Sequence, residues 1–425
     1  MNPLPIVRAS LSRNPLTVIL FSLLIALAVA LGIAISVQER ALRQGSARAA
    51  DRFDLIVAAP GSQTDILLST VYLRPTAVEL LPGAVVDQLL HDDNARFVAP
   101  VAFGDSYRDS PVIGTTAQFV TYLSDGLAEG QVFAAMDQAV VGALVDVRIG
   151  QTLQISHGHA DDMTDGSGDA DSYQGADNDH DHDHAQPHEH DHAHGHEPVT
   201  VTGRMQPTGT PWDKAVVVPV EYIWNAHVMG TGHAPGDPRI GPPWDPKLLP
   251  GLPALVVKPK TLAGAYGMRS EYRTAQSTAF FPAETLVQLY DIMGGATRVM
   301  SWLTLAAQVL VVGAILGGML AVLDLQRQRF AVLRALGASA GYVFASVWLY
   351  VGAMMLAGAV LGLPLGWAAS AIATMLISQA TGVAMTASLS WTELRMAATL
   401  LGLGCLLALI PALRIYRAPV VDNLR

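Results

Sequence analysis

The sequence is poor in the residues that build several common kinds of site. Its 425 residues include one cysteine, Cys405, which excludes a disulfide within the chain and a cluster of thiolate ligands. It has no glycine-rich loop of the G-x-x-x-x-G-K-S/T kind, in which backbone amides and a lysine hold nucleotide phosphates. Its serine, histidine and aspartate residues also form no evident catalytic constellation. We therefore do not expect an enzyme, and any ATP hydrolysis would require a separate subunit.

Charge is missing from several long stretches. The 22 residues from Leu16 to Val37, the 25 from Val299 to Leu323 and the 58 from Ala335 to Thr392 carry no charged side chain. Since about 20 apolar residues span a bilayer, we expect four transmembrane helices, at residues 16–37, 299–323, 342–365 and 396–413. A cleaved signal peptide is the alternative for residues 1–37. Its apolar region is usually about 7 to 15 residues long, which favours a retained helix.

The arginines predict the orientation of these helices, because short cytoplasmic loops are enriched in Arg and Lys. The arginine-rich segments are the N-terminus before residue 16, residues 324–341 and residues 414–425. We expect all three, and hence both termini, in the cytoplasm. Two crossings within residues 335–392 would place the C-terminal tail outside, against this bias. One crossing is therefore expected there, followed by an extracytoplasmic-side segment, 366–395, with a helical or partly interfacial stretch from Trp367 to Gln379.

The region between the first two predicted helices, residues 38–298, has the mixed pattern of an α+β domain. Short β-rich runs occur at Asp54–Val57, Ala139–Val147, Thr152–Ile155, Val199–Thr202, Ala215–Val220 and Ala254–Lys258. Helix-like stretches occur at Thr76–His91 and Glu284–Met293. The predicted fold class is a membrane α-helical protein with four transmembrane helices and a large extracytoplasmic α+β domain inserted between the first and second helices.

A tract rich in histidine and aspartate, residues 157–197, interrupts this domain. It has too few apolar residues to fold unaided, so we expect a disordered insert in a loop between the strands at Thr152 and Val199. It contains 12 Asp and Glu and no Lys or Arg, which accounts for the net charge of −10. It also contains ten of the 13 histidines: His157, His159, His180, His182, His184, His188, His190, His192, His194 and His196.

The spacing of these histidines suits metal binding. In an extended chain, residues two apart point the same way about 6.5 to 7 Å apart, so a flexible segment can gather several imidazoles around one ion. Zinc takes such ligands at about 2.0 to 2.1 Å, and imidazole suits Ni, Cu and Co as well. We expect several weak, exchangeable sites for zinc or another transition metal. A solvated acidic linker and a pH-responsive segment are the alternatives, while His227 and His233 are expected to be ordinary loop histidines.

A short basic segment, residues 324–341, lies between the second and third predicted helices. Arg327 and Arg334 recur with apolar residues at helical spacings, which predicts a short amphipathic helix at the membrane surface. Gly337 stands where such a helix would end, a position that glycine often occupies. The alternative is a basic loop that only fixes the orientation of the chain.

Over nearly its whole length, the chain resembles the MacB, FtsX and LolC/LolE permeases, the mechanotransmission class of ABC transporters. The resemblance is carried by RQRFAVLRALGAS at 327–339, VAAPGSQTDILLSTVY at 57–72, VTGRMQPTGTPWDKAVVVP at 201–219 and PALRIYRAPVVDNLR at 411–425. The His-rich tract departs from the usual pattern. The resemblance implies a homodimeric, multi-pass permease of the bacterial inner membrane, driven by a separate ABC ATPase subunit. The residues expected to dock on that ATPase are Arg327, Phe330, Leu333, Arg334, Leu336 and Gly337.

The predicted function is a permease that couples ATP hydrolysis by its partner to movement of its periplasmic domain, in an export or extraction system related to zinc or another transition metal. A periplasmic metal carrier or adaptor is a further expected partner, and nucleic acid is not. The alternatives are an FtsX-like scaffold that regulates a cell-envelope enzyme without transport, and LolC/LolE-like release of lipoproteins.

The four predicted membrane helices contain several glycines and no charged side chain. Ion pathways through bilayers usually contain ionisable side chains, so we do not expect this chain to conduct bare metal ions. The glycines instead predict close packing between helices. They are Gly313, Gly317 and Gly318 on the second helix and Gly352, Gly358, Gly362 and Gly366 on the third and just beyond it.

Overall fold

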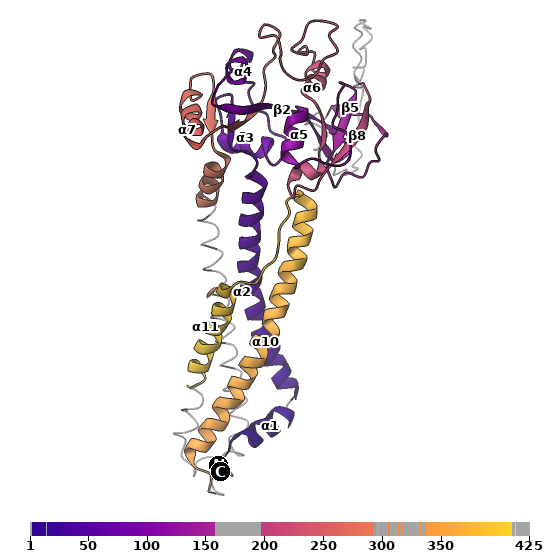
Figure 1. Ribbon diagram of the computed structural model, residues 1–425. Coiled ribbons are helices and arrows are strands. Elements are labelled where there is room, and N and C mark those ends of the chain that lie inside the picture. Colours follow the sequence, from indigo (N-terminus) through magenta and orange to yellow (C-terminus); the bar gives the residue numbers. More distant parts are fainter. Residues whose placement is uncertain are drawn as a thin grey trace, which may run out of the picture. The chain divides into compact units, whose positions relative to one another are not determined.

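The computed structural model describes residues 2–13, 15–157, 197–292 and 337–409, together with Leu413 and single positions between 294 and 332. The chain forms two compact units (Figure 1). Unit 1 comprises residues 1–47 and 288–425, and unit 2 comprises residues 48–287. Unit 2 falls inside the region 38–298 that the sequence predicts to be an α+β domain.

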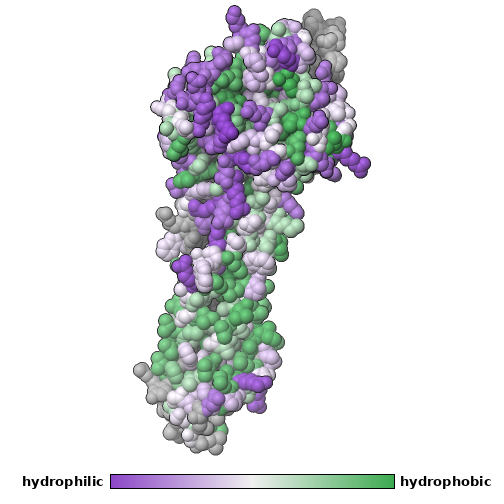
Figure 2. Space-filling view, in the orientation of Figure 1, coloured by the Kyte–Doolittle hydropathy of each residue, from purple (hydrophilic) through white to green (hydrophobic). Residues whose placement is uncertain are grey.

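The described part of unit 1 is mostly helical. Its helices are α1 (Leu4–Arg13), α2 (Pro15–Ala50), α10 (Ala340–Thr381) and α11 (Trp391–Leu407). Among the described residues, α2 and α10 are the helices that are long and apolar enough to cross a bilayer. The surface along these helices is largely hydrophobic (Figure 2), as contact with lipid requires.

Both long helices continue beyond their predicted ends. The first was expected to end at Val37 and the third at Leu365, but α2 reaches Ala50 and α10 reaches Thr381. Residues 367–379 are therefore part of α10 and not a separate interfacial stretch. A 42-residue helix is about 63 Å long, roughly twice the thickness of the hydrocarbon core. The end of the uncharged run at Val37 is therefore not the end of α2.

The other two predicted membrane helices are described less fully. The helix expected at 299–323 lies largely outside the described residues, and the positions described within it, such as Trp302 and Leu305, are helical and exposed. The helix expected at 396–413 overlaps α11, which begins earlier, at Trp391. Four crossings therefore stay a prediction.

Unit 2 is built on one mixed sheet of 11 strands. In spatial order the main path is β11 (Thr278–Phe280), β1 (Leu55–Ala58), β10 (Ala254–Pro259), β2 (Ala95–Tyr107), β3 (Ser110–Thr115), β9 (Val216–Pro219), β5 (Gln138–Val141), β8 (Val199–Met205) and β4 (Leu127–Gly130). Two short strands lie off this path, where β6 (Thr152–Leu153) pairs with β8 and β7 (Ser156–His157) pairs with β2. The β3–β9 and β5–β8 pairs are parallel and the others are antiparallel.

All six predicted β-rich runs contain a strand, with shifted ends. The run predicted to continue to Val147 forms a strand only as far as Val141. The next residue, Gly142, lies against the backbone of Asp213, which would be 2.4 Å from a Cβ added to the glycine. The sequence pattern does not reveal β2, the longest strand. Pro100 and Gly104 interrupt its apolar residues, and a bulge between Phe103 and Asp105 breaks the alternation.

Short helices flank the strands of this sheet. They are α3 (Gln63–Thr70), α4 (Gly83–Leu90), α5 (Ala117–Leu123), α6 (Val220–Ala226) and α7 (Leu262–Glu271), and residues 282–292 are also helical. Three begin at hydroxyl caps, which are Ser62, Thr116 and Thr261. The helix expected from Thr76 begins only at Gly83, because Pro82 is extended and the residue before a proline avoids helical backbone angles.

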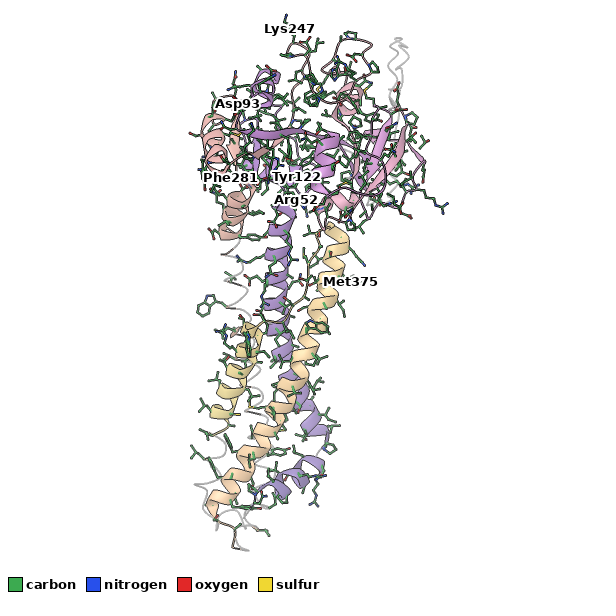
Figure 3. All side chains as sticks on the ribbon, in the orientation of Figure 1. Arg52, Asp93, Tyr122, Lys247, Phe281 and Met375 are labelled. Atoms are coloured by element: carbon green, nitrogen blue, oxygen red, sulfur yellow. The ribbon has the colours of Figure 1, made fainter. Side chains whose placement is uncertain are left out.

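Large aromatic side chains fill part of the core of unit 2. The ring of Phe119 makes edge contacts with Trp212 and Phe53, at centroid distances of 5.5 and 5.8 Å. All three side chains are buried. Nearer the surface, the Arg52 guanidinium lies over the ring of Tyr122, 5.5 Å from its centroid (Figure 3). The first residues after α2 are thereby fixed to α5, which carries Tyr122.

Candidate functional site

The predicted coupling segment, residues 324–341, is described only at its end. The expected docking residues Arg327, Phe330, Leu333, Arg334 and Leu336 lie outside the described residues. Gly337 has a φ of +97°, a left-handed conformation that favours glycine. Ser339 then caps α10, accepting a hydrogen bond from the Tyr342 amide at 3.3 Å. The long helix α10 therefore starts at Ala340, within the last two residues of the coupling segment.

The N-terminal helix α1 lies beside the start of α10, an arrangement that the sequence does not predict. The Tyr342 hydroxyl donates to the Asn2 carbonyl at 3.3 Å. Val7 of α1 is buried with residues of α2 and α10 in one apolar cluster. The segment before the first predicted membrane helix is thus an ordered part of unit 1.

Helices α2 and α10 pack closely through glycines. Added Cβ atoms at Gly358, Gly362 and Gly366 would lie 2.8, 2.7 and 2.7 Å from the carbonyl oxygens of Ser22, Ala26 and Ala30, respectively. These oxygens belong to the backbone of α2, so they cannot rotate away as a side chain could. By contrast, an added Cβ at Gly352 would meet nothing within 4 Å. Three of the predicted glycines therefore have the expected packing role, whereas added Cβ atoms at Gly313 and Gly317, like the one at Gly352, would meet nothing within 4 Å.

A polar cluster fastens the start of α11 to α2. Glu393 is completely buried and forms an ion pair with Arg40 of α2. The same carboxylate accepts hydrogen bonds from the Ser36 hydroxyl at 2.9 Å and from the Ser390 amide at 2.8 Å. The second of these completes a capping box at the N-terminus of α11. The helices that follow the coupling segment are thus tied to α2 by an ion pair as well as by packing.

The histidine tract is described at its two ends. Residues 158–196, which include the other nine histidines expected to bind metal, lie outside the described residues. His157 belongs to β7, where it is the antiparallel partner of Asp105 on β2. At the other end, the carbonyl of Glu197 accepts a hydrogen bond from the Tyr222 hydroxyl of α6 at 2.8 Å. Both ends of the tract are therefore held against β2 and α6.

His227 lies at this place, although the sequence suggests an ordinary loop histidine. Its Nε2 is 3.7 Å from Oδ1 of Asp105, whose side chain is fully buried. Burial raises the pKa of the nearby Tyr222 hydroxyl, and the negative charges of Asp105 and Glu197 raise it further. The neighbourhood of the tract's ends is therefore rich in acidic groups.

His233 lies in a different environment. Its Nε2 is 3.9 Å from Oε1 of Glu221, and both side chains are buried. That carboxylate oxygen accepts hydrogen bonds from the Trp244 indole at 2.7 Å and the Gly241 amide at 2.6 Å. Burial raises the pKa of Glu221, while these hydrogen bonds oppose the shift. The hydrogen bonds that Glu221 accepts hold the loop after α6 in place, and His233 lies buried beside them.

The part of the chain that the structure describes contains no group of three or more His, Cys, Asp or Glu side chains placed to hold a metal ion. Asp105 is the acidic residue that sequence reasoning misses. It stands alone in β2, without a neighbouring histidine or a motif. Only the pairing of β7 with β2 and the position of α6 bring it next to His227 and the tract.

Residues 298–420 match the family described as FtsX-like permease C-terminal. This range includes the coupling segment and most of the C-terminal residues on which the predicted resemblance is based, and it confirms that resemblance. A comparison with curated proteins gave no match.

Two solved structures are similar in fold to part of the chain. The periplasmic region of MacB from Actinobacillus actinomycetemcomitans is 10% identical with a TM-score of 0.30, over 57% of this chain and 95% of that one. The extracellular domain of the noncanonic ABC-type transporter YknZ from Gram-positive bacteria is 9% identical with a TM-score of 0.28, over 53% of this chain and 98% of that one.

Proposed function

Because its C-terminal part is that of an FtsX-like permease, we propose that this chain is the permease subunit of an ABC transporter and transmits ATP-driven motion from a separate ATPase to unit 2. The family match over residues 298–420 is the observation that carries the proposal. It covers the coupling segment and the helices on both sides of it. In this proposal the subunit is a homodimer in the bacterial inner membrane, with both termini in the cytoplasm.

The packing within unit 1 supplies a mechanical path for this motion. The coupling segment leads directly into α10, which is packed against α2 through its glycines. Helix α2 is unbroken from Pro15 to Ala50, and β1 of the sheet begins only five residues later, at Leu55. Closely packed interiors transmit strain because they are hard to compress. In this proposal a displacement at the coupling segment is passed through α10 to α2 within unit 1.

The histidine tract supports a role related to transition metals. Ten histidines within residues 157–197 supply nitrogen ligands for zinc or a related ion. In this proposal the tract holds exchangeable metal received from a periplasmic carrier or adaptor, and the transporter works in metal-related export or extraction.

Docking is tested by co-purification of the ATPase with full-length Leu333→Asp protein. A buried aspartate at an apolar contact leaves a charge without compensation, so we expect the association to be lost. Leu248→Asp is the matched control, because Leu248 is a leucine of unit 2 that is 40% exposed. It should leave the complex intact. An unchanged complex with Leu333→Asp would contradict the docking role.

Regulation without transport is the second candidate function, since the matching family is FtsX-like. Reconstitution of the chain with its ATPase in proteoliposomes distinguishes the two. ATP-dependent release or movement of a cargo would support the permease. A cell-envelope hydrolase that binds unit 2 and is activated by ATP, with no species moved, would support the scaffold instead.

A further inference from the structure

The two ends of the histidine tract meet the fixed part of unit 2 at one place. The outgoing end pairs His157 with Asp105 of β2, and the returning end bonds Glu197 to Tyr222 of α6. His227 is the residue that ends α6. Strand β2, helix α6 and both ends of the tract therefore converge around the Asp105 carboxylate and the His227 imidazole.

The distance between these two side chains suits shared ligation of a metal ion. Two donors bound to one tetrahedral zinc at about 2.0 to 2.1 Å lie about 3.3 Å apart. The observed distance between His227 Nε2 and Asp105 Oδ1 is 3.7 Å, which is long for a direct hydrogen bond. A shift of a few tenths of an ångström would bring both atoms to coordination distance from the same ion.

The local backbone places both groups for this purpose. Gly104 lies in the bulge of β2 with a φ of +149°, and an added Cβ there would be 3.7 Å from Cε1 and Nε2 of His227. The imidazole therefore lies beside this part of the strand, at a distance that would be an ordinary contact for a side chain at position 104. Bulges commonly re-aim a side chain next to a functional site, and here the bulge directly precedes Asp105.

Exposure gives an ion a way in. The His227 side chain is 29% exposed, whereas that of Asp105 is 0% exposed. An ion can therefore approach along the imidazole and reach a carboxylate that is shielded from water, where attraction between opposite charges is stronger than in bulk solvent.

We propose that Asp105 and His227 form a fixed transition-metal site at the base of the histidine tract, which receives zinc or a similar ion from the exchangeable sites of the tract. This inference rests on the metal-related part of the proposed function. The backbone of His157 stands at the register position opposite Asp105, which places the start of the tract beside this site.

The other two histidines outside the tract show what sets His227 apart. His91 lies 3.3 Å from Asp87 (Nδ1 to Oδ1), but its side chain is 75% exposed. His233 lies near a carboxylate but is 2% exposed. Among the three, His227 alone combines a buried carboxylate with partial access to solvent and with the ends of the tract.

The test is calorimetric titration of the full chain, in detergent, with zinc chloride. A second protein has residues 158–196 replaced by a short glycine–serine linker, which removes the exchangeable sites. We expect the unaltered chain to bind several zinc ions and the linker variant to keep one. In the linker variant, His227→Ala and Asp105→Asn should each weaken that site by more than the roughly 10- to 100-fold typical of changes outside the ligand set. His91→Ala should leave it unchanged.

Thermal unfolding separates lost ligation from lost folding. His227→Ala and Asp105→Asn should unfold at the temperature of the parent without zinc and lose the upward shift that zinc gives the parent.

Failure of this inference is distinct from failure of the proposed function. If the full chain binds several zinc ions and the linker variant none, the tract binds metal and the fixed site is overturned. If His227→Ala binds zinc as its parent does, the fixed site is also overturned. If neither the full chain nor the linker variant binds zinc, both the fixed site and the metal-related part of the function fail.

Discussion

The two units of this chain are packed by opposite means. In unit 1, α10 approaches α2 through glycines, so that side chains are absent where the helices are closest. In unit 2, the centre holds large buried side chains such as Phe119 and Trp212. The difference follows from the solvent. In water, burying a large apolar side chain stabilises the fold, whereas in lipid the gain comes from close approach of helices. Removal of atoms should therefore damage unit 2, and addition of atoms should damage unit 1.

The largest effect is expected from Phe119→Ala in unit 2. Deletion of a buried aromatic ring typically lowers the free energy of unfolding by about 3 to 5 kcal/mol, and Phe119 also loses its edge contacts with Trp212 and Phe53. Denaturant unfolding followed by tryptophan fluorescence, with hydrogen exchange to assign the change to unit 2, measures it. Leu144→Ala is the control, since Leu144 is 61% exposed. Equal effects of the two substitutions would contradict an aromatic core.

The next effect is expected from Glu393→Ala in unit 1. Removal of one partner from a buried ion pair costs about 3 to 5 kcal/mol. The Arg40 side chain is 23% exposed. We therefore expect the free energy of unfolding to fall by about 3 kcal/mol, the lower end of that range. Pulse proteolysis in detergent measures it. The exposed pair Glu39–Arg43 on the same helix is the control, and Glu39→Ala should cost no more than about 1 kcal/mol. If Glu393→Ala and Glu39→Ala lower the stability by similar amounts, the ion pair between Glu393 and Arg40 is not buried in solution.

Gly362→Ala should have a smaller effect of the opposite kind, because it adds one methyl group. Its Cβ would lie 2.7 Å from the Ala26 carbonyl oxygen, and overpacking of a tight contact typically costs about 1 to 3 kcal/mol. Gly352→Ala is the matched control on the same helix, since its Cβ meets nothing within 4 Å. Removing a glycine from a helix interior should stabilise it by up to about 1 kcal/mol. The contrast between the units fails if both substitutions change pulse-proteolysis stability alike.

The same contrast explains how much the sequence predicts. The uncharged runs locate the long helices α2 and α10, because hydrophobic length is a property of contiguous residues. They do not locate the helix ends, since α2 continues through charged residues to Ala50, whereas α10 ends at Thr381, before the uncharged run ends at Thr392. The spacing of the glycines predicts packing for the helix as a whole, but only the structure shows that Gly352 faces no partner within 4 Å.

In unit 2 the sequence predicts less, because its organisation depends on pairing between distant residues. The apolar runs at β1, β9 and β10 are evident. The strand β2 is not, since its proline, glycine and aspartate contradict a simple strand pattern. The histidine tract can be proposed to bind metal from the sequence alone, because its histidines are close together in the chain. The pair Asp105–His227 cannot be predicted in this way, because these residues are 122 positions apart and only the fold brings them together.

The smallest effect concerns pH and a buried carboxylate of unit 2. Burial raises the pKa of Glu221 above 4.5, so folding favours its protonated form. The resulting stability is complete below the unfolded-state pKa and is lost as the pH rises through the raised, folded-state pKa. The free energy of unfolding of unit 2 should therefore decline above about pH 4.5, with a slope from this one group of at most about 1.4 kcal/mol per pH unit.

Glu221→Gln should flatten this decline, because the amide oxygen can still accept from Trp244 and Gly241 but carries no charge to bury. Denaturant unfolding at a series of pH values measures the slope. Glu129→Gln, at an exposed glutamate, should leave it unchanged. His233 faces the same carboxylate, and its positive charge lowers the Glu221 pKa. His233→Gln should therefore keep the decline and move it to higher pH. If Glu221→Gln leaves the decline unchanged, the buried carboxylate is not the group that causes it.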